Sequence, residues 1–357
     1  GTVLSSPLVS GDSLFTLRTG QLNIGFVPDI FGANQRQVES LQAYADSQKY
    51  QLDALKITIA TNVASSVIQE QLLLEQISAL KDALGTAKDQ LSHTRRMFES
   101  GYASRIDLAQ QEAAYAQMSA MLPPLNKQLE LTKDLLSVLC GSYPENPMGI
   151  EQAHQIATPE HLPNMVPSQL VSHRPDVRAA EELLHSTHAL IGVAVANMLP
   201  QISLSAGVAY TGPSAAGLFT NDNKSWGILG AITAPLFSAG TLSARKRAAE
   251  QAALAAQSQY KNVVLTAFQN VADVLYTLDA DKKSWEISEA AENANLKILD
   301  LTDQQYKTGY ASGPQLLAAK QAWLTAKVNE LSARSSYLLD TVALYQALGG
   351  GWKDSNP

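Results

Sequence analysis

One tetrapeptide occurs twice in the chain, at a spacing that also relates several other segments. Gly101-Tyr102-Ala103-Ser104 recurs as Gly309-Tyr310-Ala311-Ser312, an offset of 208 positions (309 − 101). The same offset, without a gap, aligns Gly32 with Gly240, Asn62-Val63-Ala64 with Asn270-Val271-Ala272, and Gly141 with Gly349. Since one register holds over roughly 110 residues, the sequence predicts two copies of one long unit.

Each copy is expected to form a long helix, a tight turn and a shorter returning helix. Residues 33–100 contain no proline and a single glycine, Gly85. Apolar or small residues recur there in steps of three and four, which is typical of a heptad seam: Leu73, Ile77, Leu80, Leu84, Ala87 and Leu91. A helix of this length would be roughly 100 Å long and needs packing partners along all of it.

The second copy shows similar spacing in both of its helices. Its long segment has Ile287, Ala291, Ala294, Ile298 and Leu301, and its returning segment has Leu331, Ser335, Leu338, Val342 and Tyr345. Alanine and serine at such positions favour close helix approach. Gly101 and Gly309 are expected to end the long helices in a left-handed C-cap, with Ser104 and Ser312 as the next N-caps. Pro123-Pro124 must kink or interrupt the first returning helix.

Three segments have the pattern of β-strands. Residues 201–210 alternate small or polar with apolar side chains, at the length of a transmembrane strand. A second strand is expected from Trp226 to Phe237, and a third over Leu14–Val27 with its phase broken near Arg18–Gly20. Tyr210 and Trp226 flank the intervening loop, where a membrane-interface aromatic belt would fall.

Composition excludes several function classes. The net charge is −7 without a basic cluster, which argues against a nucleic-acid partner. The single cysteine, Cys140, excludes an intramolecular disulfide and is expected to be a buried small hydrophobe. No apolar stretch is long enough for a membrane-spanning helix.

No group of residues indicates catalysis or a cofactor. His185 and His188 share a helix face without further metal ligands, and no phosphate loop or nucleophile elbow is present. Arg174, Asp176 and Arg178 are expected to form a structural salt-bridge cluster at a helix start. We therefore predict that the chain is not an enzyme and needs no metal or other cofactor.

The chain resembles the TolC family of outer-membrane efflux ducts, most closely its NodT-type lipoprotein branch. The resemblance covers essentially the whole sequence and is carried by these segments: 162–163, 170–181 (LVSHRPDVRAAE), 191–194, Pro200, 235–237 with Gly240, and 267–273 (AFQNVAD). It implies a mainly α-helical protein with membrane β-strands, in which a homotrimer contributes four strands per chain to one β-barrel. That barrel would continue into a long α-helical barrel.

The resemblance also implies a division of the chain and a set of partners. Strands of the outer-membrane barrel are expected in 12–31 and 200–237, periplasmic helical hairpins in 32–141 and 240–349, and an equatorial region in 142–199 and 350–357. The chain would be the passive outer-membrane component of a tripartite efflux or secretion system in a Gram-negative bacterium. Its partners would be a periplasmic adaptor, an inner-membrane pump and outer-membrane lipid. The alternative is a soluble, elongated coiled-coil scaffold.

The two turns and their first helical residues are the candidate site. The resemblance places Gly101, Tyr102, Ala103, Ser104, Gly309, Tyr310, Ala311 and Ser312 at the tunnel end, as an adaptor-docking surface. Asp107 is a candidate pore constriction, or else a solvated carboxylate favoured by the helix dipole. Gln315 is its uncharged counterpart in the second copy.

The family branch begins with an acylated cysteine, which the sequence does not show. The offset of 208 places counterparts of 167–199 and 200–210 mostly upstream of Gly1. The expectation is therefore at least ~50 further N-terminal residues, with a secretion signal and a first barrel strand, since an unpaired strand edge is not tolerated in lipid.

Overall fold

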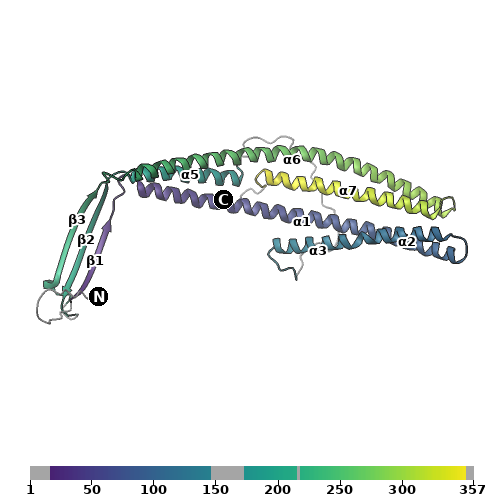
Figure 1. The fold of residues 1–357 in the computed structure, drawn as a ribbon, viewed down its shortest axis with the longest axis horizontal. Helices are drawn as coiled ribbons and strands as arrows, with labels where there is room; N and C mark the ends of the chain where they lie inside the picture. The colour runs from purple at the N-terminus through teal and green to yellow at the C-terminus, as the bar shows by residue number, and fades with distance from the viewer. Residues whose placement is uncertain (1–16, 146–172, 215–217, 351–357) are drawn as a thin grey trace, which may run out of the picture. The chain divides into compact units, whose positions relative to one another are not determined.

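The computed structural model describes residues 17–145, 173–214 and 218–350, and most of them are helical (Figure 1). The helices are α1 (Ala33–Glu99), α2 (Arg105–Ala120), α3 (Leu122–Leu139), α5 (Pro175–Ala196), α6 (Thr241–Lys307) and α7 (Gly313–Ala347). The strands are β1 (Arg18–Phe26), β2 (Gln201–Gly212) and β3 (Lys224–Thr233), with a short 3-10 helix, η1, at Asn221–Asn223. Two compact units result, one holding the sheet and one holding both helix turns.

Helix boundaries follow the spacing seen in the sequence. Helices α1 and α6 both contain 67 residues, and their first residues lie 208 positions apart (241 − 33). Glycines with positive φ also occur in pairs at that spacing: Gly32 and Gly240, Gly101 and Gly309, Gly141 and Gly349. The predicted interruption near Pro123 is confirmed, because α2 ends at Ala120 and α3 begins at Leu122.

The unit with the turns is formed by Lys49–Arg178 and Asn262–Pro357, and α1 lies at its centre. Two clusters of apolar side chains join α1 to its neighbours. One contains Leu80, Ala83 and Ala87 of α1, Met118 of α2, and Leu317 and Leu324 of α7. The other contains Leu73, Ile77 and Leu129. The predicted seam of α1 is therefore buried by α2 and α3 on one side and α7 on the other.

The predicted seam of α6 has a different environment. Ile287, Ile298 and Leu301 are 71%, 53% and 59% exposed, so no residue of the described ranges covers them. Helix α6 is instead joined to α7 by tryptophans. The Trp285 indole donates to Glu330 Oε1 at 3.1 Å and stacks on Tyr337, with ring centroids 5.7 Å apart.

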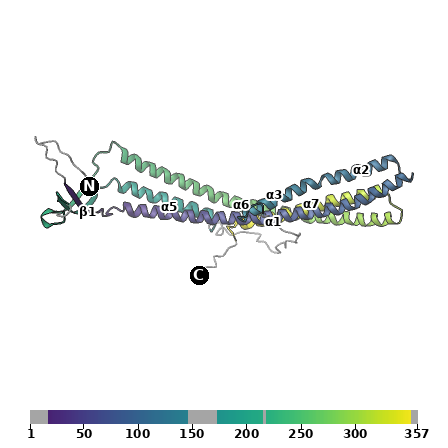
Figure 2. The same ribbon diagram turned by 90° about the horizontal axis from the view of Figure 1, so that it is seen from below.

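The unit with the sheet contains the first part of α1, most of α5 and the beginning of α6. Helices α1 and α5 run side by side here (Figures 1 and 2). Small residues make this close approach possible. The Ser40 and Ser186 hydroxyls lie 2.9 Å apart, and the Ser47 hydroxyl donates to the carbonyl of Ala179 at 2.8 Å.

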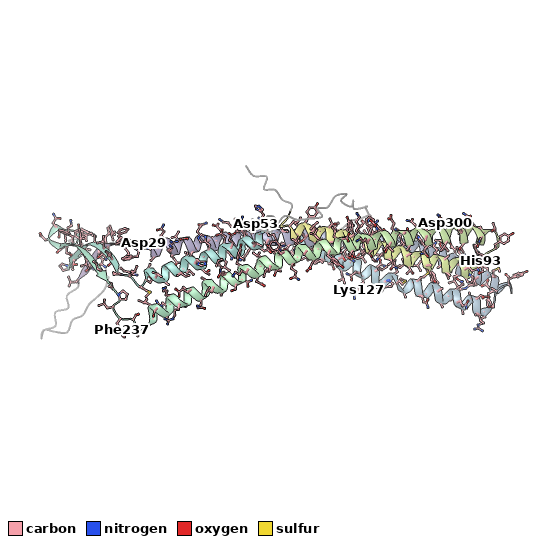
Figure 3. All side chains as sticks on the ribbon, turned by 90° about the horizontal axis from the view of Figure 1, so that it is seen from above. Asp29, Asp53, His93, Lys127, Phe237 and Asp300 are labelled. Atoms are coloured by element: carbon pink, nitrogen blue, oxygen red, sulfur yellow. The ribbon has the colours of Figure 1, made fainter. Side chains whose placement is uncertain are left out.

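Helix α1 begins directly after the turn that follows β1. Asp29, labelled in Figure 3, accepts hydrogen bonds from the backbone amides of Asn34 and Gln35 at 3.1 and 2.8 Å. A carboxylate at a helix N-terminus satisfies free amides and complements the helix dipole. Strand and long helix are thus joined by a short capped connection.

The sheet has the order β1-β2-β3, and both pairs of neighbours are antiparallel. The strand predicted at 201–210 is confirmed. The break in apolar alternation near Arg18–Gly20 does not interrupt the strand, because pairing with β2 runs without a gap from Arg18 to Phe26. The strand predicted to reach Phe237 ends at Thr233, since Pro235 offers no amide for pairing. Among the described residues, no helix is long and apolar enough to cross a membrane.

The prediction that Cys140 is buried is also wrong. Cys140 is the C-cap residue of α3 and is exposed. The buried positions of that last turn are Leu136 and Ser137, and the helix ends before it can bring another residue to the same face.

Candidate functional site

The first turn closes α1 with a Schellman motif. Gly101 has φ of 77°, and the amide of Tyr102 donates to the carbonyl of Met97 at 2.8 Å. A residue with a side chain is strained at this φ, which explains the glycine. Tyr102 is 80% exposed, so its ring is not used to pack the turn.

The second turn has the same hydrogen bonds. Gly309 has φ of 81°, and the amide of Tyr310 donates to the carbonyl of Gln305 at 2.8 Å. Tyr310 is 88% exposed. Both turns belong to the same unit and lie at the same end of it (Figure 1). The structure therefore presents two exposed tyrosines on two turns of equal backbone conformation. The other members of the predicted tip set, Ala103, Ser104, Ala311 and Ser312, lie in these turns.

The two turns differ in how the next helix is capped. Ser104 and Asp107 form a capping box, in which the Ser104 amide donates to Asp107 Oδ2 at 2.9 Å and the Asp107 amide to Ser104 Oγ at 3.1 Å. Hydrogen bonds from Ser104 keep the pKa of Asp107 below its ordinary value. At the other turn, the Ser312 amide donates to Gln315 Oε1 at 2.7 Å. The first cap is charged and the second is neutral.

Polar contacts that the sequence did not predict hold α7 against α1. The Lys320 ammonium donates to the Thr86 hydroxyl, and the Arg334 guanidinium forms a salt bridge with Glu75. Burial lowers the pKa of Lys320. Because Glu75 and Arg334 are 259 positions apart, no local spacing could link them. These contacts connect the two helical hairpins of this unit.

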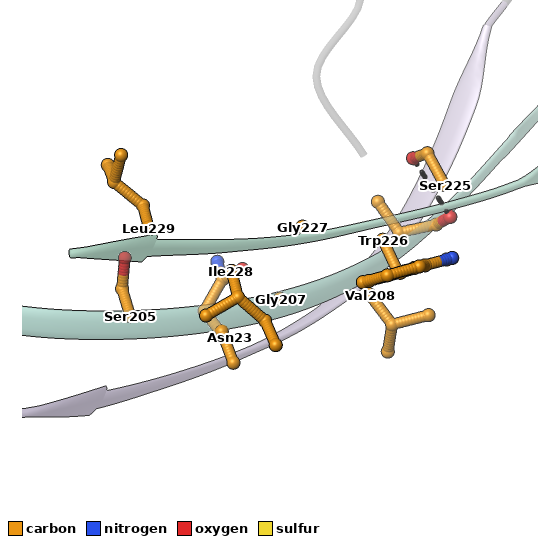
Figure 4. A pocket seen from close by; sticks show the side chains of 11 residues that line it. Asn23, Ser205, Gly207, Val208, Ser225, Trp226, Gly227, Ile228 and Leu229 are labelled. Atoms are coloured by element: carbon orange, nitrogen blue, oxygen red, sulfur yellow. Dashed lines mark hydrogen bonds between the residues drawn. The ribbon is translucent and has the colours of Figure 1, made fainter.

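In the other unit, the sheet has two chemically different faces. Asn23 pairs with Gly207, which pairs with Gly227, and this row forms the floor of a hollow of about 420 Å³ (Figure 4). Ser205 and Ser225 lie on the same side as this row, since strand residues alternate between faces, and Leu229 is the large apolar side chain among the described residues of this face. The opposite face is apolar and carries Leu22, Ile24, Phe26, Leu204, Val208, Trp226, Ile228 and Ile232.

The predicted interface aromatics lie on the apolar face. Tyr210 and Trp226 occupy positions in register with Lys224 and Val208. Trp226 is 74% exposed. The Tyr210 ring instead contacts the Phe219 ring edge-on, with the ring centroids 5.3 Å apart. Both therefore lie at the end of the sheet that the β2–β3 connection closes.

Of the two histidines at positions 185 and 188, His185 contacts a carboxylate of α1. His185 Nε2 lies 3.0 Å from Glu39 Oε1, and Arg36 donates to the other oxygen of Glu39 at 2.6 Å. The hydrogen bond to Glu39 raises the pKa of His185 and lowers that of Glu39. Within the described part of the chain, no group of three or more His, Cys, Asp or Glu side chains is placed to hold a metal ion.

Two members of the salt-bridge cluster predicted at the start of α5, Arg174 and Asp176, form an ion pair. The buried Arg174 guanidinium binds both carboxylate oxygens of Asp176, at 3.0 and 2.8 Å, and donates to the carbonyl of Ala347 at 2.8 Å. It thereby ties the start of α5 to the end of α7.

Comparison with known proteins gives consistent results. The sequence profile of the family described as outer membrane efflux protein matches residues 12–142 and 166–350. The chain is 27% identical to the cation efflux system protein CusC of Escherichia coli, over 97% of this chain and 75% of that protein. It is 28% identical to the toluene efflux pump outer membrane protein TtgC of Pseudomonas putida, over 91% of this chain and 67% of that protein.

Solved structures have the same fold. The outer membrane channel CmeC of Campylobacter jejuni superposes with a TM-score of 0.90 at 22% identity, covering 100% of this chain and 76% of CmeC. The outer membrane protein VceC of Vibrio cholerae gives 0.86 at 24% identity, covering 98% and 84%.

Proposed function

Because the chain belongs to the outer membrane efflux protein family, we propose that it is the outer-membrane channel of a tripartite efflux system. The observation that carries this proposal is the two-faced sheet, whose strands lead directly into two helices of 67 residues each. An apolar outer face with a small, polar inner face is the pattern of a transmembrane β-barrel. The scaffold alternative has no use for such a sheet.

A trimer is supported by surfaces that the described residues leave uncovered. Strands β1 and β3 are the edges of the described sheet, and unpaired edges are costly in lipid. The exposed apolar side chains of α6 are likewise expected to be buried against another copy of the chain. Three copies that each contribute four strands would close a twelve-stranded barrel, and their helical hairpins would form the periplasmic α-barrel.

The turns are proposed as the docking surface for the periplasmic adaptor. Their equal backbone conformation and the two exposed tyrosines support this assignment. Asp107 is proposed to line the constriction of the pore, with Gln315 as its neutral counterpart. The inner-membrane pump would supply the energy, and the chain itself would conduct passively. The two sequence relatives described above are named for cations and for toluene, so the proposed cargo class is small molecules or ions.

The proposal is tested by membrane extraction, conductance and transport. The protein should require detergent for extraction and form discrete single channels in planar bilayers. Deletion of the gene should raise the intracellular accumulation of a fluorescent efflux dye, and the wild-type gene should restore efflux. A protein that is extracted without detergent and does not conduct would instead favour the coiled-coil scaffold.

A further inference from the structure

The strands of the sheet carry two charged side chains, and both are basic. Arg18 begins β1 and Lys224 begins β3, while β2 has no charged residue. Arg18 pairs with Gly212, and Lys224 pairs with Tyr210. Since alternate residues share a face, Arg18 lies on the same side as Leu22 and Lys224 on the same side as Trp226. Both charges therefore lie on the apolar face.

Both charges also lie at the same end of the sheet. Their partners in β2 are two residues apart, next to the β2–β3 connection, whereas the opposite end leads to α1 and α6. Two strand spacings of about 4.8 Å and two residue rises of about 3.4 Å place their backbones roughly 12 Å apart. A charge on a lipid-facing surface is costly in the hydrocarbon and tolerated at the interface. Arg18 and Lys224 lie at the end of the sheet, where a charge on the lipid-facing surface is tolerated.

Neither basic side chain has an acidic partner within the described residues. Arg18 and Lys224 are exposed and form no salt bridge with described residues. The acidic residue nearest to Lys224 in the described sequence is Asp222, which belongs to η1 and not to a strand. Tyr210 of β2 lies between the two charges, and Trp226 lies on the same face of β3, two residues beyond Lys224. A planar guanidinium, an ammonium and two amphipathic rings thus share one interfacial patch.

We propose that Arg18, Lys224, Tyr210 and Trp226 form a binding site for the phosphate of an anionic lipid headgroup in the leaflet at the loop end. Arginine binds phosphate oxygens with paired N–H donors, and lysine contributes a point charge. Both aliphatic stems can lie along the apolar face while their charges reach the headgroups. The site rests on the proposed channel function, because it requires the apolar face to be in contact with lipid.

The test compares lipid preference among charge variants. Wild-type protein and R18Q/K224Q are each reconstituted in nanodiscs of equal parts phosphatidylglycerol and phosphatidylcholine. The phospholipids retained after detergent exchange are then quantified. Wild type should retain phosphatidylglycerol preferentially, and each basic residue removed should reduce that preference up to roughly fivefold. The matched control K127Q/K297Q removes two exposed helix charges and should keep the wild-type preference.

Further variants distinguish a lipid site from a general effect of charge and from a site for free phosphate. R18K/K224R keeps both charges and should keep the preference, and R18Q/K224Q should still conduct in pure phosphatidylcholine bilayers. Inorganic phosphate at millimolar concentration should not compete with the lipid. An unchanged preference in R18Q/K224Q, an equal loss in K127Q/K297Q, or displacement of the lipid by free phosphate would each overturn the proposal. Loss of conductance in wild type as well would count against the channel function itself.

Discussion

Helices α1 and α6 have equal lengths and equivalent positions in the sequence, but their middle segments are packed differently. Ala83 of α1 is 0% exposed, whereas Ala291, its counterpart at an offset of 208, is exposed. Other seam positions differ in the same way, although these two are not counterparts: Leu80 of α1 is 2% exposed, whereas Ile298 of α6 is 53% exposed. Two helices with the same type of apolar spacing therefore play different parts: α1 is an interior helix of its unit, and α6 has a face that no described part of the chain covers.

The difference shows that burial is decided by neighbours and not by the spacing alone. Helix α1 has α2 and α3 on one side and α7 on the other. Helix α6 contacts α7 through tryptophan side chains, including the 2.9 Å hydrogen bond from Trp323 to Glu292. Its remaining apolar face has the character of a subunit interface.

The largest effect is expected from polar substitutions on that face of α6. The variant I287Q/I298Q/L301Q should lose trimer assembly, because three apolar contacts per interface are replaced by amides. The control K282Q/N293Q/K297Q changes three polar positions of the same helix and should leave the assembly intact. Chemical cross-linking of membranes, followed by gel electrophoresis, measures both. Equal assembly of the two variants would contradict an interface on this face.

Substitution in the interior helix should act on the chain itself. Leu80→Ala should lower the free energy of unfolding by about 2–5 kcal/mol, because it removes buried methyl groups and leaves a cavity. Denaturant unfolding followed by circular dichroism measures the change. A loss below about 1 kcal/mol would place Leu80 outside the tightly packed core.

The turns should tolerate side chains less well than the helix interior. Gly101→Val and Gly309→Val should each cost about 1–3 kcal/mol, since a β-branched residue resists positive φ. Gly85 is the matched control: it too has no atom within 4 Å of an added Cβ, but it lies inside α1 without positive φ. Gly85→Ala should stabilise the chain by up to about 1 kcal/mol.

The same pair of variants tests adaptor docking. In the double variant G101V/G309V, efflux and adaptor cross-linking should fall while membrane insertion persists. Full cross-linking in that variant would remove the turns from the proposed docking surface.

Much of this fold could be predicted from the sequence, because its elements are long and periodic. The glycine turns, their serine caps and the proline break follow from local backbone chemistry. The strand at 201–210 follows from strict alternation. The sequence could not predict which apolar seam is buried within the chain and which is left exposed. Both long helices show similar spacing, and only tertiary contacts decide which seam is covered. Long-range polar pairs, such as Glu75 with Arg334, leave no local pattern either.

A smaller effect is expected at the charged cap of the first turn. Asp107→Asn removes one carboxylate per chain, and three carboxylates near a pore axis would attract cations. Single-channel recordings should therefore show lower cation selectivity or weaker block by polyvalent cations. Gln315→Glu adds a carboxylate at the equivalent position and should act in the opposite direction. Unchanged selectivity in both variants would place these side chains outside the pore.

The smallest effect is a pH dependence of the contact between α1 and α5. The raised pKa of His185 means that its stabilisation is complete below the unfolded value near 6.5 and is lost as the pH rises through the folded value. Glu39 has a lowered pKa, so its stabilisation is present above its ordinary value of 4.5 and is lost as the pH falls through the folded value. The contact should be strongest between about pH 4.5 and pH 6.5.

Hydrogen exchange of the α5 amides measures the strength of this contact. Its interpretation has to include the other charged side chains near His185 and Glu39. Arg36 on α1 and Glu182 on α5 also face this pair: Arg36 forms a salt bridge with Glu39, and Glu182 lies 3.6 Å from His185. Amides of α5 should be better protected at pH 6 than at pH 8.5, after correction for intrinsic exchange. The variant His185→Gln should abolish the difference. An equal pH dependence in that variant would assign it to another group.

The mass of the assembled protein tests most directly whether the uncovered face of α6 belongs to an interface with other copies. Native mass spectrometry or light scattering in mild detergent should give three chains per particle, and the same preparation should conduct in planar bilayers. A stable single-chain particle that conducts would contradict the account, because α6 and the edges of the sheet would then function without a second copy.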